Sequence, residues 1–415
     1  MSGSSPLTGR KSRRSEQTPT VRDFYLSRAR RISLVRWAIL LLLVLFVAYG
    51  FLMHGSELTM DNFRYMLKFL SFTESDRAMT GELVRFDYAE DNRGALYKGD
   101  VVVLNGSGIS VYSQDAEKVF SFAFRMDNPR IIATDDSVYA YDLGGKEIRI
   151  FNSYSQIARL VLDYPIYGFS AVSGNGFAVV TAEKNYRTAI YVYDQYARQI
   201  YKRLLSDTYA DYVSLRDDGQ SFAVLGHYSQ GGYLVSFLQT YSVRREDPEL
   251  SLAFSGEMPL RVAWLPLNRL MMMTGSALRV FDGESETPVA SLSLEGETLE
   301  GCTVSHGRIL LTTAGSGLSG GSVLRVLDAD LNEIRSDRFE GSIDQKTIVG
   351  DAVYVLTVGT IHELPLGGGP EKTYPVSQDV VAVLENASGQ PVVFEKKLAS
   401  LLSSYPSDGS AGEAG

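Results

Sequence analysis

Short apolar or alternating segments recur along most of this chain, from about Gly81 to Glu395, between turns rich in Gly, Asp and Asn. Alternation of apolar and polar positions is typical of β-strands, whereas a helix places apolar residues three and four positions apart. No long helical period interrupts the segments in this part of the sequence. The pattern therefore predicts an all-β domain over residues 81–395.

One phrase repeats within this domain: a strand ends on an aromatic or apolar residue, an Asp follows, and a second strand begins after a turn. Its copies are Ser137–Phe151, Ala189–Arg203, Ala277–Leu292 and Val323–Phe339, with a weaker one at Ile109–Phe122. We expect the Asp carboxylate to accept hydrogen bonds from turn amides. Repeats of about 40–50 residues with roughly four strands each indicate the blades of a β-propeller, because a blade must stack on its neighbours to bury both faces.

We expect about seven four-stranded blades, within a range of roughly six to eight. Open β-sandwiches and a β-solenoid are the alternatives, but solenoids repeat at shorter periods and sandwiches do not repeat one phrase at near-constant intervals. The last apolar segments, VVAVLEN and QPVVFE, have no phrase after them. We expect them to form a sheet with the first strand, Leu83–Tyr88, which would close the ring and remove its open edge.

A different pattern near the N-terminus is the uncharged apolar run Trp37–Met53. Extended over residues 32–53, it approaches the roughly 20 residues of a membrane-spanning helix. Residues 1–36 carry nine basic and two acidic side chains, and basic flanks remain in the cytoplasm. We predict an uncleaved signal-anchor, with the N-terminus in the cytoplasm and the propeller on the outer side of the cell membrane. A signal peptide cleaved after Ala48-Tyr49-Gly50 is the alternative, although the run exceeds the 7–15 residues of such peptides.

The other segments outside the propeller are expected to have little structure of their own. Residues 1–31 predict a disordered basic tail, and residues 396–415 a C-terminal tail. Residues 54–80 predict a linker that contains a short amphipathic helix at Glu57–Phe72. The N-terminal balance of +7 within a whole-chain charge of −9 leaves about −16 for residues 37–415, which argues against a nucleic-acid partner.

The basic tail, the span at Trp37–Met53, the helix start Thr59-Met60-Asp61-Asn62 and the YVYD-like repeats together carry a resemblance. The layout of Arg28 to about Glu395 resembles an uncharacterised family of membrane-anchored propellers of Gram-positive bacteria, a domain of unknown function. More generally, the repeats are similar to WD-repeat and quinoprotein-type propellers. The family has no assigned activity. Quinoprotein blades dock through a repeated tryptophan, whereas this chain has two, Trp37 and Trp264, so the resemblance implies no quinone cofactor.

We predict no catalytic, cofactor or metal site, and no nucleotide ligand. Gly315–Gly320 matches G-x-G-x-x-G, but a strand follows it instead of a helix, which indicates a hairpin turn. The four His residues occur singly, which does not support zinc. Cys302 has no partner for an internal disulfide and is expected to be a buried thiol in an inner strand.

Tyrosine is abundant, with 24 residues in the chain, many of them between Tyr139 and Tyr241. A half-exposed sheet surface explains much of this enrichment. Several tyrosines, however, lie near predicted turns, where rigid rings can stack on sugars or hold a peptide. We predict Tyr186, Tyr209 and Tyr228 as ligand-binding residues, with His227 in a loop beside them.

Two functions are consistent with this sequence. The preferred one is a non-enzymatic binding or scaffold module at the cell envelope, whose partner is an envelope protein, a peptide or a wall polymer. The alternative is an envelope glycan or peptide hydrolase with carboxylates in the channel, about 5–9.5 Å apart in a glycosidase. Asp135-Asp136, Asp217-Asp218 and Glu246-Asp247 all fall in predicted turns. A channel lined by Val, Ala, Ser and Thr would favour the scaffold, and converging carboxylates the hydrolase.

Overall fold

The computed structural model describes residues 35–45, 83–113, 116–152, 155–283, 285–315 and 320–407. Residues 35–45 form a helix in one compact unit, and Ser71–Gly415 form a second unit. The predicted basic tail, the Glu57–Phe72 helix and the two ends of the predicted span 32–53 lie outside the described residues. In the part of the chain that is described, no helix is long and apolar enough to cross a membrane.

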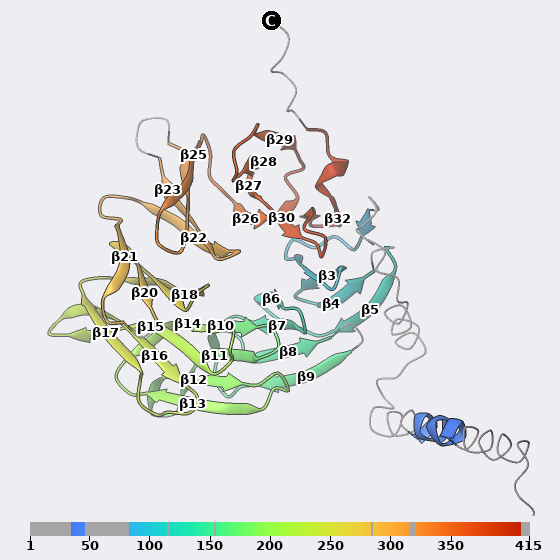
Figure 1. The fold of residues 1–415 in the computed structure, drawn as a ribbon, viewed down its shortest axis with the longest axis horizontal. Helices are drawn as coiled ribbons and strands as arrows, with labels where there is room; N and C mark the ends of the chain where they lie inside the picture. Colours follow the sequence, from blue (N-terminus) through green and yellow to red (C-terminus); the bar gives the residue numbers. More distant parts are fainter. Residues whose placement is uncertain are drawn as a thin grey trace, which may run out of the picture. The chain divides into compact units, whose positions relative to one another are not determined.

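Eight antiparallel four-stranded sheets make up the second unit and form the blades of a β-propeller (Figure 1). Blade 1 consists of β2 (Arg93–Tyr97), β3 (Asp100–Asn105), β4 (Gly108–Tyr112) and β5 (Lys118–Ala123). Blade 2 consists of β6 (Pro129–Ala133), β7 (Val138–Asp142), β8 (Glu147–Phe151) and β9 (Gln156–Val161). Blade 3 consists of β10 (Ile166–Val172), β11 (Gly176–Glu183), β12 (Tyr186–Tyr193) and β13 (Gln199–Leu205). Blade 4 consists of β14 (Tyr209–Leu215), β15 (Ser221–Gln230), β16 (Tyr233–Ser242) and β17 (Leu250–Ser255).

The second half of the ring has the same plan. Blade 5 consists of β18 (Pro259–Leu265), β19 (Arg269–Thr274), β20 (Ala277–Asp282) and β21 (Pro288–Ser293). Blade 6 consists of β22 (Leu299–Ser305), β23 (Arg308–Ala314), β24 (Ser322–Leu327) and β25 (Glu333–Phe339). Blade 7 consists of β26 (Gln345–Val349), β27 (Ala352–Thr357), β28 (Thr360–Pro365) and β29 (Lys372–Pro375). Blade 8 consists of β30 (Val380–Glu385), β31 (Pro391–Glu395), β32 (Leu398–Leu401) and β1 (Val84–Arg85).

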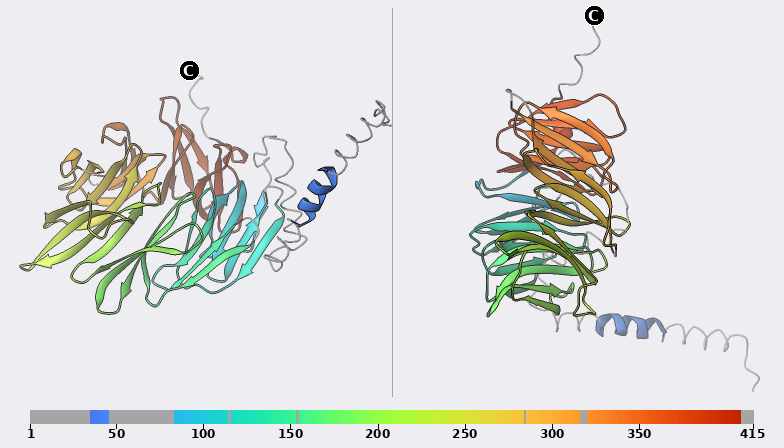
Figure 2. Two further views of the ribbon diagram at one scale, coloured as in Figure 1. Left: turned by 60° about the horizontal axis from the view of Figure 1, so that its bottom comes forward. Right: turned by 90° about the vertical axis from the view of Figure 1, so that its left-hand side faces the viewer.

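The first-named strand of each blade is innermost and lines the central channel. Inner strands of neighbouring blades contact one another, as β10 contacts β14 and β14 contacts β18, and the contact of β2 with β30 closes the ring. Figure 2 shows the blades side by side around this ring. The outermost strands alternate between exposed and half-buried positions, as in β9 and β21, because only one of their faces packs on the next blade.

The ring closes where the N-terminal strand joins the last sheet, as the sequence predicts. β1 pairs with β32 through Val84 opposite Ala399 and Arg85 opposite Leu398. The sheet therefore includes β32, and a short 3₁₀ helix, Leu402–Ser404, follows it. The ring extends beyond residue 395, where the sequence pattern places its end.

Buried side chains fill the spaces between blades. The second strand of each blade is almost continuously apolar, for example Val101, Val102, Val103 and Leu104 of β3, because both of its faces pack against neighbours. One cluster joins blades 1 and 8 through Val101 and Phe394. Burial between adjacent sheets thus holds each blade in place.

The structure has eight blades rather than the expected seven, and the position of one repeated phrase explains the difference. Asp194 and Asp328 follow the third strands of their blades and accept backbone hydrogen bonds in the next turn, as predicted. Asp142, in contrast, ends the second strand of blade 2 and accepts a hydrogen bond from the Asn128 amide. Asn152 occupies the equivalent turn position in blade 2. The phrase that contains Asp142 therefore lies one hairpin earlier than its counterparts, which lengthens the apparent repeat.

Candidate ligand-binding surface

One rim of the ring, the leading rim, carries the beginnings of all inner strands. Because neighbouring strands are antiparallel, the turns between the second and third strands of each blade lie at the same rim. The β15–β16 hairpin of blade 4 has ten-residue strands and turns at Gly231 and Gly232, both with positive φ. The leading rim therefore carries Tyr209 at the start of β14, His227 near the end of β15 and Arg187 near the start of β12.

Four side chains from three strands form the blade-4 cluster: Arg187, Tyr209, Asp211 and His227. Tyr209 lies opposite His227 in the β14–β15 ladder, and their rings stack with centroids 5.2 Å apart and 18° between planes. The Arg187 guanidinium lies 4.9 Å from the Tyr209 ring centroid and donates to the Tyr209 hydroxyl. His227 Nδ1 lies 2.6 Å from Asp211 Oδ2, so the imidazole donates to the carboxylate.

The blade-4 cluster remains accessible although its members contact one another. Tyr209 is 41% exposed, and the His227 and Asp211 side chains are about one-third exposed. A register shift between Ala210 and Tyr212 marks a β-bulge at Asp211, and bulges re-aim the side chain they carry. Cation–π and stacking contacts fix the Tyr209 ring, so that little side-chain entropy would be lost on binding.

Further tyrosines extend this surface. Tyr212 is 38% exposed and Tyr167 is 53% exposed, and both belong to inner strands near the leading rim. Burial raises the pKa of Tyr212, and the nearby Asp211 carboxylate raises it further. The Tyr212 hydroxyl therefore keeps its proton at neutral pH and can donate a hydrogen bond.

The predicted candidates separate into two groups. Tyr209 and His227 stack on each other, and Tyr186, 41% exposed, precedes Arg187 in β12. Tyr228 instead packs against the core between blades 3 and 4, with its ring centroid 6.4 Å from that of Phe237. The expectation that His227 lies in a loop was wrong, because β15 continues to Gln230.

Arg187 and Asp211 were not predicted from the sequence as members of this surface. They come from different blades and belong to no motif, and only the pairing of β14 with β15 and the packing of blade 3 on blade 4 bring them to Tyr209. Within the described residues, no group of three or more His, Cys, Asp or Glu is placed to hold a metal ion. The cluster offers an aromatic platform with one cation and one anion, a combination suited to recognition.

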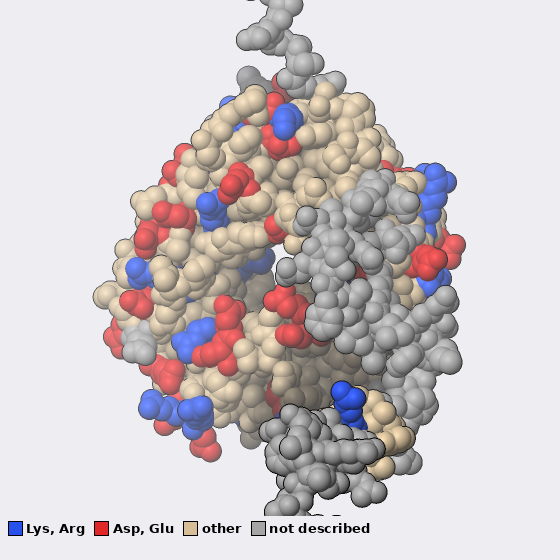
Figure 3. Space-filling view, turned by 45° about the vertical axis from the view of Figure 1, so that its right-hand side comes forward, with Lys and Arg blue, Asp and Glu red and all other residues tan. Residues whose placement is uncertain are grey.

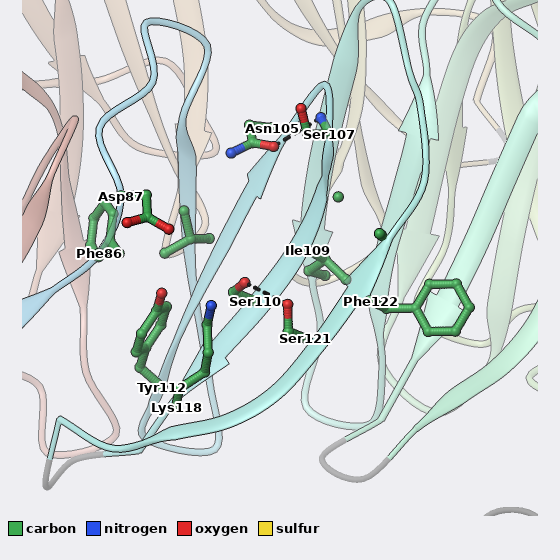
Figure 4. Close-up of a pocket in the computed structure, with 13 residues that line it drawn as sticks. Phe86, Asp87, Asn105, Ser107, Ile109, Ser110, Tyr112, Lys118, Ser121 and Phe122 are labelled. Carbon is green, nitrogen blue, oxygen red and sulfur yellow. Dashed lines mark hydrogen bonds between the residues drawn. The ribbon is translucent and has the colours of Figure 1, made fainter.

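A separate groove of about 200 Å³ lies on blade 1 beside the segment that follows β1 (Figure 4). Phe86, Tyr112 and Lys118 line it, and the Lys118 ammonium lies 5.7 Å from the Tyr112 ring centroid. The hydroxyls of Ser110 and Ser121 are hydrogen-bonded to each other across its floor at 3.2 Å. This groove shares no residue with the blade-4 cluster.

A larger cavity of about 590 Å³ lies at the opposite, trailing rim of the channel. Small and apolar residues such as Ala133, Ala171 and Val172 line it, together with the acids Asp135, Asp217 and Glu385. Nε2 of His306 lies 2.8 Å from Oε2 of Glu385, so this carboxylate has a structural partner. The lining thus combines the small and apolar residues expected of a scaffold with three carboxylates.

Asp218 accepts hydrogen bonds from turn amides, as predicted for the carboxylate pairs. Its side chain accepts from the amides of Gln220 and Ser221 at 2.8 and 2.9 Å and from the Arg216 guanidinium. Burial alone would raise the pKa of Asp218, but these hydrogen bonds outweigh it and hold the pKa below its usual value. The acid is therefore ionised and engaged in the turn between β14 and β15.

Two other predictions about single motifs are confirmed. The segment Gly315–Gly320 connects β23 to β24, which pair as an antiparallel hairpin. Cys302 lies in the inner strand β22 and is a free thiol, 8% exposed.

The fold defines the class of protein as an eight-bladed β-propeller. The chain is similar to the computationally designed Ika8 protein, with 13% identity over 77% of this chain and 99% of the other and a TM-score of 0.58. It is also similar to the C-terminal WD40 domain of Sif2, with 12% identity, the same coverage and a TM-score of 0.54. A quinohemoprotein alcohol dehydrogenase of Pseudomonas putida HK5 shares 8% identity over 75% of this chain and 71% of its own, with a TM-score of 0.52. At these identities the likeness concerns the fold alone.

The chain belongs to the DUF5711 family, a family of unknown function, whose model matches residues 78–399. No curated protein matches the chain significantly. The match covers the closed ring and confirms the predicted relationship to an uncharacterised propeller family.

Proposed function

We propose that this protein is a non-enzymatic binding module that takes its ligand on the blade-4 cluster at the leading rim. The observation that carries the proposal is the exposed Tyr209–His227 stack, held between Arg187 and Asp211. Rigid aromatic rings beside an arginine are typical of binding hot spots, because they give large contact area with few torsions to freeze. A peptide or a wall polymer would stack on Tyr209 and bond to Arg187.

The proposal includes a location. We propose that residues 32–53 anchor the chain in the cell membrane, with the N-terminus in the cytoplasm and the ring at the cell envelope. The uncharged run Trp37–Met53 and the nine basic residues before it support this arrangement. Protease added to intact cells should then degrade the ring, whereas a cytoplasmic ring would resist until the cells are lysed.

The hydrolase alternative has less support. The channel carboxylates Asp135, Asp217 and Glu385 lie at the trailing rim, and Glu385 is tied to His306. Asp218 is engaged in a turn. Glycoside hydrolysis requires two free carboxyls on opposite sides of the scissile bond. Asp218 and Glu385 are not free in this sense, because each already has a partner.

The test is crosslinked capture from intact cells with the full-length protein. The double variant Tyr209→Ala with Arg187→Gln should lose most of the partner enriched by the wild type. Tyr196→Ala is the matched control, since Tyr196 is 64% exposed and lies in a turn at the trailing rim. A variant truncated after the apolar run serves as background. Equal capture by the wild type and the double variant would refute the assignment of this surface.

A further inference from the structure

Among the described residues, four basic side chains on inner strands form no ion pair with an acid. Arg93 of β2, Arg130 of β6, Arg261 of β18 and Lys346 of β26 all lie in the half of the channel nearer the leading rim, and all are half-buried. In this same part of the chain, Nε of Arg93 and Nε of Arg261 are buried and have no hydrogen-bond partner, as is also true of Nε of the ion-paired Arg149 and Arg325.

Arginines elsewhere in the blades show the usual arrangement. Arg149, Arg279 and Arg335 form ion pairs with Glu147, Glu257 and Asp337 at 2.6 to 2.7 Å. Buried charged groups are normally paired, because leaving one unpaired costs several kcal/mol. Within the described residues, these four half-buried cations therefore lack the acid partner that Arg149, Arg279 and Arg335 have, and a bound anion would supply one.

Arg261 of β18 and Lys346 of β26 lie on the two inner strands that flank β22 of blade 6. Lys346 Nζ donates to Thr312 Oγ1 at 2.7 Å and lies 3.2 Å from where a Cβ on Gly301 would stand. Both cations act electrostatically on the thiol of Cys302, the residue after Gly301. The absence of a side chain at Gly301 thus leaves room for the ammonium between blades 6 and 7.

The local charge balance at this place is positive. Burial lowers the pKa of Lys346, and the charge of Arg261 lowers it further, whereas Glu300 and Cys302 act in the opposite sense. Glu300 is exposed and occupies the bulge between Leu299 and Gly301. Two half-buried cations therefore share one solvated carboxylate, in a chain whose net charge is −9.

We propose that Arg261 and Lys346 bind a dianionic oxyanion of phosphate chemistry in the channel beside β22. A dianion balances two cations, whereas a monocarboxylate balances one. Guanidinium offers a bidentate fork to such an anion, and the ammonium adds a point charge. Figure 3 shows an opening at the middle of the ring with charged side chains at its margin, which gives solutes access.

This proposal does not rest on the function proposed above, because it uses none of the four residues of the blade-4 cluster, although the charge of Arg261 acts on Tyr212 beside that cluster. Arg187→Gln should leave phosphate binding unchanged. Loss of partner capture with phosphate binding retained, or the reverse, would separate the two.

Cys302 provides a built-in probe, since it is the single cysteine of the chain. The rate of its alkylation by iodoacetamide is measured on the full-length protein at constant ionic strength. A bound dianion beside the thiol disfavours the thiolate, so inorganic phosphate should slow the reaction by about threefold to tenfold. Arg261→Gln combined with Lys346→Gln should abolish this slowing, whereas Arg125→Gln, which changes an almost fully exposed arginine, should not.

Thermal unfolding gives a second readout that does not depend on thiol access. Phosphate should raise the Tm of the wild type by about 2 °C or more, and should not raise that of the double variant. Glycerol 3-phosphate distinguishes the source: a matching effect indicates a phosphate carried on a larger ligand, and its absence indicates free phosphate. Equal effects of phosphate and malonate, or no effect of phosphate on either readout, would overturn the proposal.

Discussion

Closure of the ring depends on an unusually close contact between Gly94 of blade 1 and Phe394 of blade 8. A Cβ placed on Gly94 would stand 2.3 to 2.5 Å from Cδ2, Cε2 and Cγ of the Phe394 ring. Phe394 is fully buried and stacks on Phe86, with centroids 5.2 Å apart, so the ring has little freedom to move. Gly94→Ala would force a displacement of about 1 Å in a packed interface, which costs about 1–3 kcal/mol.

The partner residue permits a sharper test through a double-mutant cycle. Phe394→Leu should cost about 1–2 kcal/mol, less than the 3–5 kcal/mol of a full truncation to Ala. In the double variant the smaller side chain makes room for the new methyl group. The two changes should therefore cost about 1–2 kcal/mol less together than the sum of the single variants.

Urea unfolding of the full-length protein, followed by circular dichroism, measures these differences from midpoints at equal slope. Gly275→Ala is the control, because nothing beyond its own chain neighbours lies within 4 Å of the position that the new methyl group would take, and its φ is not positive. It should be close to neutral. A Gly94→Ala variant as stable as the wild type, or strictly additive effects, would show that this contact does not hold blades 1 and 8 together.

Two further predictions concern stability. Burial raises the pKa of Glu257, but hydrogen bonds from Arg279 at 2.7 and 2.8 Å and from Thr274 outweigh it and hold the pKa below its usual value of 4.5. The ionised carboxylate therefore stabilises the folded state above that pH, and this stabilisation is lost as the pH falls through the lowered pKa. Glu257→Gln should cost about 1–3 kcal/mol near neutral pH and should weaken the fall of the unfolding free energy in acid. The control Glu286→Gln, at an exposed position, should do neither. An unchanged fall in acid for Glu257→Gln would contradict the reasoning. The hydroxyl of the fully buried Tyr241 donates to Gln239 at 2.7 Å, so Tyr241→Phe should cost about 0.5–1.5 kcal/mol in urea unfolding. Tyr233→Phe is the control, since Tyr233 is 74% exposed. A loss for Tyr241→Phe no larger than that of the control would argue against this hydrogen bond.

Much of the fold was predictable because its signals are local. Alternation along a strand and the residues at turns depend on neighbours in sequence, so segments such as Val323–Leu327 and the turn at Asp328 could be recognised directly. The pairing of the first strand with the last sheet also followed from the strand pattern. The number of blades did not, because Asp142 and Asp194 end similar phrases at different hairpins.

The candidate surface shows where local signals fail. Tyr209 could be singled out as an aromatic residue near a turn, but its partners Arg187 and Asp211 look like ordinary polar residues of strands. Tyr228 looked equivalent to His227 from its position, yet neighbouring residues of a strand face opposite sides, and Tyr228 turns toward the core. Pairing register decided which of the two is available to a ligand.

The amino-acid pattern alone determined that this protein is an all-β ring of repeated four-stranded blades closed by its own N-terminal strand. Hydrophobic periodicity suffices for that, because each blade must bury two faces. Tertiary structure decided the number of blades, the convergence of Arg187, Tyr209, Asp211 and His227, and the placement of Arg261 and Lys346 on either side of β22. Those contacts join residues that are distant in sequence, and only the closed ring sets their distances.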